Sequence, residues 1–192
     1  MKKDLLSIIS EEDKATFTRL AAIEKELLEE RKPIFDELLK EEPIQLDPNN
    51  LSIYLKNNKK LIPIIIKHIK LSYSDKTRAY LARALAFSGA KPFWSDLVKV
   101  YKATPEGRNE ESKTRYEAKD AIASTLAQIS DKSHVEELIE LVLDPANGKS
   151  RIMLLRAFKK IKDEKCISII KELSEHPLFE KEIKSWKIKK FI

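Results

Sequence analysis

Internal repetition is the feature that most restricts how this chain can fold. Shifting the sequence by 41 residues places one apolar set onto another: Leu81, Ala82, Leu85, Ala86 and Leu97 onto Ile122, Ala123, Leu126, Ala127 and Leu138. A further shift of 32 residues carries Ile122, Leu126, Ile129, Asp131, Val135, Leu138 and Leu141 onto Leu154, Phe158, Ile161, Asp163, Ile167, Ile170 and Leu173. The polar stretch 104–112 explains the difference between the shifts as a lengthened loop. Such repetition predicts stacked units that share one continuous core.

Hydrophobic spacing indicates that these units are helical. Apolar residues recur every three or four positions, and no segment alternates convincingly with a period of two. The run 61–66 looks like a strand, but Pro63 near its start and its continuation through His68 and Ile69 favour the first turns of a helix. We therefore expect an all-α chain with helices paired as 61–71 with 76–88, 92–103 with 113–129, 134–143 with 150–161, and 164–174 with 178–190.

Residues 1–50 differ from the repeats in charge and in pattern. They hold 8 basic and 13 acidic side chains, whereas residues 51–102 hold 11 basic and 2 acidic ones. Ser10, followed by three acids, is a good helix N-cap, and Pro33 indicates the start of a second helix. We expect an acidic helical hairpin over residues 1–50 that caps a repeat array over residues 51–192.

Residues 141–163 resemble a HEAT repeat. They contain a first (A) helix, an Asp144-Pro145 turn and a second (B) helix, and residues 75–89 repeat the B-helix pattern. The resemblance extends over about residues 61–175 and covers architecture rather than function. It implies a right-handed α-α superhelix, an armadillo-like solenoid of about four helix pairs with the N-terminal hairpin at one end. In such arrays the B helices line the concave surface.

Two arginines of the predicted B helices border the apolar face. At about 100° per residue, Arg151 lies near the edge of the stripe formed by Leu154 and Phe158, and Arg78 has the equivalent place in its own helix. We interpret both as structural residues whose guanidinium groups bind an acid or the turn carbonyls near Asp144. The middle copy departs from this pattern because Lys119 stands in place of the arginine.

The predicted B helices also carry many cations, which favours an anionic partner. The net charge is +6, and its sign alternates along the chain. A basic concave face attracts acidic molecules, although the same charges could serve only to keep the chain soluble. The candidate partner-binding residues are Arg83, Lys119, Arg156, Lys159, Lys160, Lys184 and Lys187.

Residues suited to catalysis are sparse. His68, His134 and His176 lie far apart and do not form a metal-ligand pattern. The sequence has no Gly-rich phosphate loop and no serine elbow, and Cys166, its only cysteine, has the spacing of a core residue. We expect a protein that is not an enzyme, without a cofactor or a metal site.

These observations together favour a non-enzymatic adaptor or scaffold whose basic concave face binds an acidic surface or peptide of another protein. Two alternatives remain: binding of a nucleic-acid backbone by the same face, and an inhibitor or immunity-type protein. The N-terminus has no run of signal-peptide length, and no stretch approaches a membrane span. We therefore expect a cytoplasmic protein that is not associated with a membrane. The sequence leaves the oligomeric state open, and we favour a monomer.

Overall fold

The structure is a computed structural model that describes residues 10–43, 47–106 and 117–186. Within these ranges it is helical and contains no strand. The α-helices are α1 (Glu11–Glu41), α2 (Leu51–Asn57), α3 (Ile62–Ile69), α4 (Asp75–Ala84), α5 (Trp94–Ala103), α6 (Glu117–Ile129), α7 (Val135–Leu143), α8 (Arg151–Ile161), α9 (Glu164–Glu172) and α10 (Glu180–Ser185). Short 3-10 helices lie at Pro48–Asn50, Lys59–Leu61, Ser88–Phe93, Lys132–His134, Pro145–Ser150 and Leu173–Glu175. The expectation of an all-α chain is confirmed, including a helix rather than a strand at residues 64–66.

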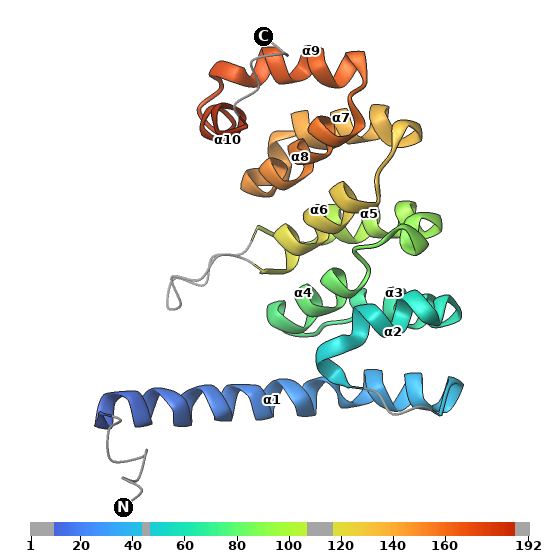
Figure 1. The fold of residues 1–192 in the computed structure, drawn as a ribbon, viewed down its shortest axis with the longest axis vertical. Coiled ribbons are helices and arrows are strands. Elements are labelled where there is room, and N and C mark those ends of the chain that lie inside the picture. Colours follow the sequence, from blue (N-terminus) through green and yellow to red (C-terminus); the bar gives the residue numbers. More distant parts are fainter. Residues whose placement is uncertain (1–9, 44–46, 107–116, 187–192) are drawn as a thin grey trace, which may run out of the picture.

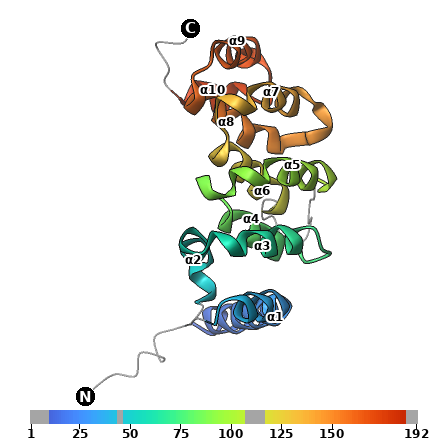
Figure 2. The same ribbon diagram turned by 90° about the vertical axis from the view of Figure 1, so that its right-hand side faces the viewer.

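The helices from α3 to α9 stack in two layers (Figure 1, Figure 2). One layer, here called the even layer, joins α4 to α6 and α6 to α8, and the other joins α3 to α5 and α7 to α9. Each helix of the even layer also packs against the helix that precedes it in the sequence. Helix α1 lies at one end of the stack, and α9 and α10 lie at the other (Figure 1).

A single core runs between the layers. Leu81 of α4, Leu126 of α6, and Leu154 and Phe158 of α8 are all almost completely buried. When the sequence is shifted onto itself, Leu81 superimposes on Leu154 and Leu126 superimposes on Phe158, so the repetition marks the side chains that hold the stack together. Thr125 joins two helices of the even layer, because its Oγ1 donates a hydrogen bond to the Ala82 carbonyl at 2.7 Å.

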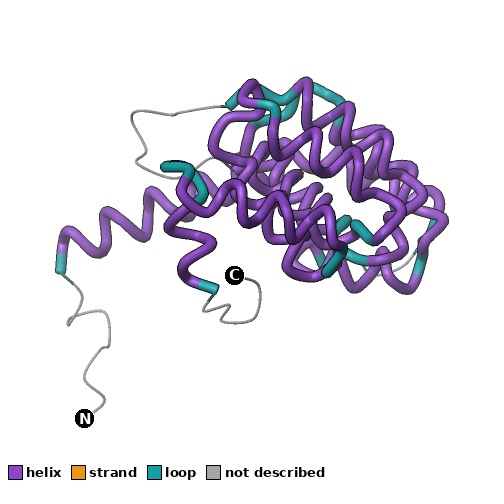
Figure 3. Tube along the Cα trace, turned by 90° about the horizontal axis from the view of Figure 1, so that it is seen from above, coloured by secondary structure: helices purple, strands orange, loops and turns teal. Residues whose placement is uncertain are grey.

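The expected N-terminal hairpin is wrong, because α1 is one helix that continues through Pro33. Proline lacks the N–H that would bind the carbonyl four residues earlier, so it weakens this turn. The helix continues because Ile34 and Leu38, on the next turns, are completely buried and belong to the core of the whole chain. Pro33 itself is exposed. Seen along the stack, the N-terminal part of α1 projects well beyond the layers (Figure 3).

Helix α2 is an element that the predicted pairing omits. Its Leu51 and Leu55 are buried, and it packs against α4. Asp47 begins this region by accepting a hydrogen bond from the backbone N–H of Asn49 at 2.9 Å. Tyr80 of α4 then donates to the Pro48 carbonyl at 2.5 Å, which ties the connection after α1 to the even layer.

Candidate partner-binding face

The exposed side of the even layer carries several of the predicted binding residues. We call it the even face, and it comprises Arg83 of α4, Ser124 and Gln128 of α6, and Arg156, Lys159 and Lys160 of α8. Arg83, Ser124 and Arg156 occupy the same place in three successive repeats. Since the axes of packed helices lie about 8–10 Å apart, the axes of α4 and α8, which carry the two arginines, are separated by up to roughly 16–20 Å.

An open cleft lies between α6 and α8 on this face. Its volume is ≈ 310 Å³, and it is lined by Ser124, Ala127, Gln128, Met153, Arg156, Ala157 and Lys160. The two alanines and Met153 supply an apolar surface, and the two cations stand beside it. This combination suits a ligand that presents both carboxylates and a small apolar group.

Lys160 forms hydrogen bonds with the C-terminal end of α6. Its Nζ donates to the carbonyl oxygens of Ala127 and Gln128, both at 2.8 Å. The last carbonyls of a helix have no partner within the helix and carry partial negative charge, so a lysine stabilises them. Partial burial lowers the pKa of Lys160 from its ordinary value.

Arg156 forms a two-pronged ion pair with Glu182 of α10. Its Nε and Nη2 lie 2.9 and 3.1 Å from the two carboxylate oxygens. The hydrogen bonds to Glu182 raise the pKa of Arg156, and those from Arg156 lower the pKa of Glu182. Trp186 donates its Nε1–H to the same carboxylate at 2.9 Å, and the Lys159 Nζ lies 5.7 Å from the Trp186 ring centre. The basic charge at α8 is therefore partly balanced.

Lys119 is not on the even face, which corrects its assignment as a partner-binding residue. Only 4% of it is exposed, its Nζ donates to the Thr104 carbonyl at 2.9 Å, and it lies over the Tyr101 ring at 5.0 Å. The reason is its register, because Lys119 superimposes on Arg78 and Arg151 rather than on Arg83. Burial lowers the pKa of Lys119.

Arg78 and Arg151 make the same kind of contact as Lys119. Arg78 donates through Nε to the Ile69 carbonyl at 3.3 Å and through Nη2 to Thr104 Oγ1 at 2.7 Å. Arg151 donates through Nε to the Gly148 carbonyl at 2.9 Å and through Nη1 to the Val142 carbonyl at 3.3 Å. All three cations thus bind at the end of the preceding helix of their own pair.

The other predicted residues have separate positions. Asp144 accepts a hydrogen bond from the Ala146 N–H at 2.9 Å and caps the 3-10 helix that follows. Lys184 pairs with Glu180 within α10. Lys187 lies outside the described residues. Arg83 is exposed, and within the described ranges its guanidinium has no hydrogen-bond or ion-pair partner.

Sequence reasoning missed the residues that limit this face. Glu182 forms an ion pair with Arg156, and the ring of Trp186 lies beside Lys159. The sequence predicts a helix over residues 178–190, but it does not predict that this helix contacts α8. The spacing of Glu182 and Trp186, four residues apart on one helix, was the available signal. Asp120 of α6 adds a further negative charge that acts on Arg156.

The histidines and the cysteine have structural surroundings. His68 is buried between Tyr73 and Glu37, with nitrogen–oxygen distances of 2.9 Å on both sides. His176 accepts a hydrogen bond from the Leu178 N–H through Nδ1. Burial raises the pKa of the Cys166 thiol to about 11, so the thiolate is scarce at neutral pH. Among the described residues no group of three or more acidic, histidine or cysteine side chains could hold a metal ion.

Comparisons with family models, with curated proteins and with solved structures found no match to this chain. Over the described ranges, every helix is too short or too polar to cross a bilayer.

Proposed function

We propose that the chain is a non-enzymatic interaction module that binds an acidic surface or peptide of another protein through the even face. In this proposal the stack is a HEAT-like right-handed superhelix whose even layer forms the concave side. The two-layer packing of consecutive helix pairs supports it. So does the position shared by Arg78, Lys119 and Arg151, because equivalent contacts in successive units are typical of repeat proteins.

The cleft between α6 and α8 is the observation that carries the proposal. Arg156 uses two of its five donors on Glu182 and keeps the others for a second carboxylate. Arg83 and Lys159 are exposed on either side of α6, which itself offers the neutral Ser124 and Gln128. An acidic segment that crosses α6 would meet a cation at each end and, in between, an apolar surface at Met153.

The proposal also includes the cellular compartment, the oligomeric state and the cofactors of the chain. We place the module in the cytoplasm, as a monomer that uses no cofactor and no metal. The single buried thiol of Cys166 agrees with a reducing compartment, since it has no second cysteine to pair with.

A synthetic acidic helix tests the even face directly. The probe, here called the glutamate peptide, is a labelled five-turn helix with leucine at helical spacing and glutamate elsewhere, and binding is measured by fluorescence anisotropy at 150 mM salt. The Arg83→Glu/Lys159→Glu variant should bind it at least tenfold more weakly. The control variant Lys99→Glu/Lys171→Glu changes two exposed lysines of the other layer and should bind like the unaltered chain. Equal losses in both variants would show attraction by net charge alone and would overturn the proposal.

Random-sequence duplex DNA gives the second arm of this experiment. An adaptor for acidic proteins should not retain it at 150 mM salt. Retention that falls with salt at a log–log slope of about 0.9 per phosphate contacted, and that is lost in the Arg83→Glu/Lys159→Glu variant, would replace the proposal with nucleic-acid backbone binding.

A further inference from the structure

The N-terminal part of α1 leaves an apolar face without a partner. Glu30 and Arg31 tie α1 to α4, through hydrogen bonds to Ser74 and Thr77 and a contact of Arg31 over Tyr80. The preceding residues 12–29, here called the α1 overhang, span about 27 Å at about 1.5 Å per residue, and their N-terminal part projects beyond the stack (Figure 1). Phe17 and Leu20 in this segment are 61% and 56% exposed.

Leu20 and Ile23 continue the buried face of the same helix, whereas Phe17 lies about 60° around the helix from Leu20. Successive residues of a helix are rotated by about 100°, so residues three, four, seven and eleven apart share one side. Leu20 and Ile23 therefore lie on the side of Leu27, and so do Ile34 and Leu38, which the stack buries. One stripe runs along α1, completely buried at Ile34 and Leu38, partly buried at Leu27 and Ile23, and exposed at Leu20. A surface helix normally buries such a stripe.

Acidic side chains border the open stripe. The same rotation places Asp13 and Glu24 along one edge of it, and Glu12 and Glu26 along the other edge together with Arg19. The lysines of this segment, Lys14 and Lys25, fall on the opposite side of the helix. An apolar strip with acidic edges is complementary to a helix that has an apolar strip with basic edges.

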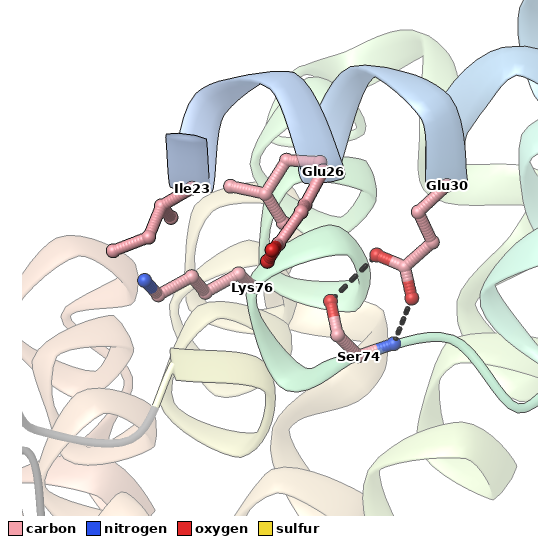
Figure 4. Close-up of a pocket in the computed structure, with 6 residues that line it drawn as sticks. Ile23, Glu26, Glu30, Ser74 and Lys76 are labelled. Carbon is pink, nitrogen blue, oxygen red and sulfur yellow. Dashed lines mark hydrogen bonds between the residues drawn. The ribbon is translucent and has the colours of Figure 1, made fainter. Parts of the chain in front are cut away.

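We infer that the α1 overhang is a second docking surface, occupied by a basic amphipathic helix of another protein that lies along the open stripe. A cleft marks the inner end of this surface, where α1 crosses the start of α4. Its volume is ≈ 420 Å³, and it is lined by Ile23, Glu26, Leu27, Glu30, Ser74 and Lys76. Figure 4 shows Ile23 and Glu26 pointing from α1 toward the side of Lys76, with Glu30 held by Ser74. The cleft accepts an apolar side chain from the end of the incoming helix.

A second copy of the chain fits this surface less well. Pairing two overhangs would bring the acids that border one stripe against the same acids of the other, and like charges across an interface are repulsive. Arg19 is the single basic residue beside the stripe and cannot balance the four acids. Charge complementarity thus favours a basic helix over the overhang of a second copy as the occupant of this stripe.

Two synthetic helices separate this surface from the even face. The first, the lysine peptide, has leucine at helical spacing and lysine elsewhere, and the second is the glutamate peptide of equal length. At 150 mM salt, Leu20→Gln should weaken binding of the lysine peptide at least tenfold and leave binding of the glutamate peptide unchanged. Arg83→Glu/Lys159→Glu should have the opposite pattern. Because the two surfaces are tested by different peptides, the failure of one proposal is distinguishable from the failure of the other.

A matched control and a charge reversal complete the test. Ile53→Gln alters an apolar residue of α2 that is 54% exposed, nearly the same as Leu20, and should bind the lysine peptide normally. The variant Glu24→Lys/Glu26→Lys should no longer bind the lysine peptide, because two acids beside the stripe become basic. Its melting temperature should be unchanged, since both residues are exposed. Equal binding of the lysine peptide by Leu20→Gln and Ile53→Gln would overturn the inference. So would a dimer in analytical ultracentrifugation that Leu20→Gln dissociates, because a second copy would then occupy the stripe.

Discussion

Individual cations of this chain divide into two kinds, according to their place around the helix. Arg78, Lys119 and Arg151 border the core and bind carbonyls, whereas Arg83 lies five residues after Arg78 and faces outward. The first kind holds each helix pair together. Only the second kind is available to a partner, so substitutions of the two kinds should have opposite effects.

Arg151→Ala should lower the free energy of unfolding by about 1–3 kcal/mol, because the carbonyls of Gly148 and Val142 lose a charged donor in a partly buried place. The same change at Arg83, which is exposed, should stay within about 0.5 kcal/mol. Urea denaturation measures both values. Equal effects would mean that the carbonyl contacts contribute nothing to stability.

The pair between Arg156 and Glu182 should make stability depend on pH in the acid range. The pKa of Glu182 is lowered in the folded state, first by its hydrogen bonds to Arg156. The carboxylate therefore stabilises the fold above its unfolded pKa, near 4.5, and this contribution disappears as the pH falls through the lower, folded pKa.

Glu182→Gln tests this linkage by thermal melting from pH 7 to pH 3. At pH 7 the variant should be less stable by up to about 1 kcal/mol, since the pair is half-exposed. Near pH 3 the two melting curves should coincide. A difference that persists at pH 3 would show that the amide disturbs packing rather than charge.

At the scale of elements, α1 shows where a local rule gives way to packing. Pro33 predicts a break, but α1 continues because Ile34 and Leu38 are buried against the stack on the following turns. Proline inside a helix costs about 3 kcal/mol or more, and burial of the Ile34 and Leu38 side chains contributes about 1.5–3 kcal/mol each. The sequence shows the apolar stripe of α1, but it does not predict that the stack buries Ile34 and Leu38.

Pro33→Ala should raise the free energy of unfolding by about 1–3 kcal/mol, because alanine restores the N–H that bonds to the Glu29 carbonyl. The position is exposed, so the change disturbs no packing. Circular dichroism during thermal unfolding measures the effect. An unchanged or lower melting temperature would indicate that proline's restriction of the unfolded chain outweighs the missing hydrogen bond.

The repeats show how far the sequence could predict this molecule. Shifts of the sequence find Leu126 and Leu154 in the core because burial repeats with the helix pairs. The binding face is harder to predict, since charge alone does not show that Lys119 points inward or that Glu182 reaches back to Arg156. Both contacts depend on which helices are neighbours in the folded chain, and the pattern within one repeat does not contain that information.

At the scale of the whole molecule, the stack should lose stability from its ends. The even layer has its most extensive contacts between α4 and α6 and between α6 and α8, whereas α10 packs mainly on the turn after α9. In arrays of this kind each unit is supported by its neighbours, so a unit with one neighbour opens more easily.

Hydrogen exchange with mass spectrometry tests this gradient through two buried residues. Leu126→Ala, in the middle, should speed exchange in α4, α6 and α8 together and cost about 2–5 kcal/mol. Ile183→Ala, in α10, should speed exchange in α9 and α10 and leave α4 protected. Uniform acceleration by both variants would indicate a single cooperative unit without a gradient.

The projection of α1 also has a mechanical consequence. The helix is held near Glu30 and Arg31, and its free end lies about 27 Å away. A tilt of about 10° at that point of attachment would move the far tip, at Glu12, by roughly 5 Å, so a small repacking beside Ser74 and Thr77 becomes a large displacement there. A partner bound along the overhang would thus move measurably whenever the packing of α1 against α3 and α4 changes.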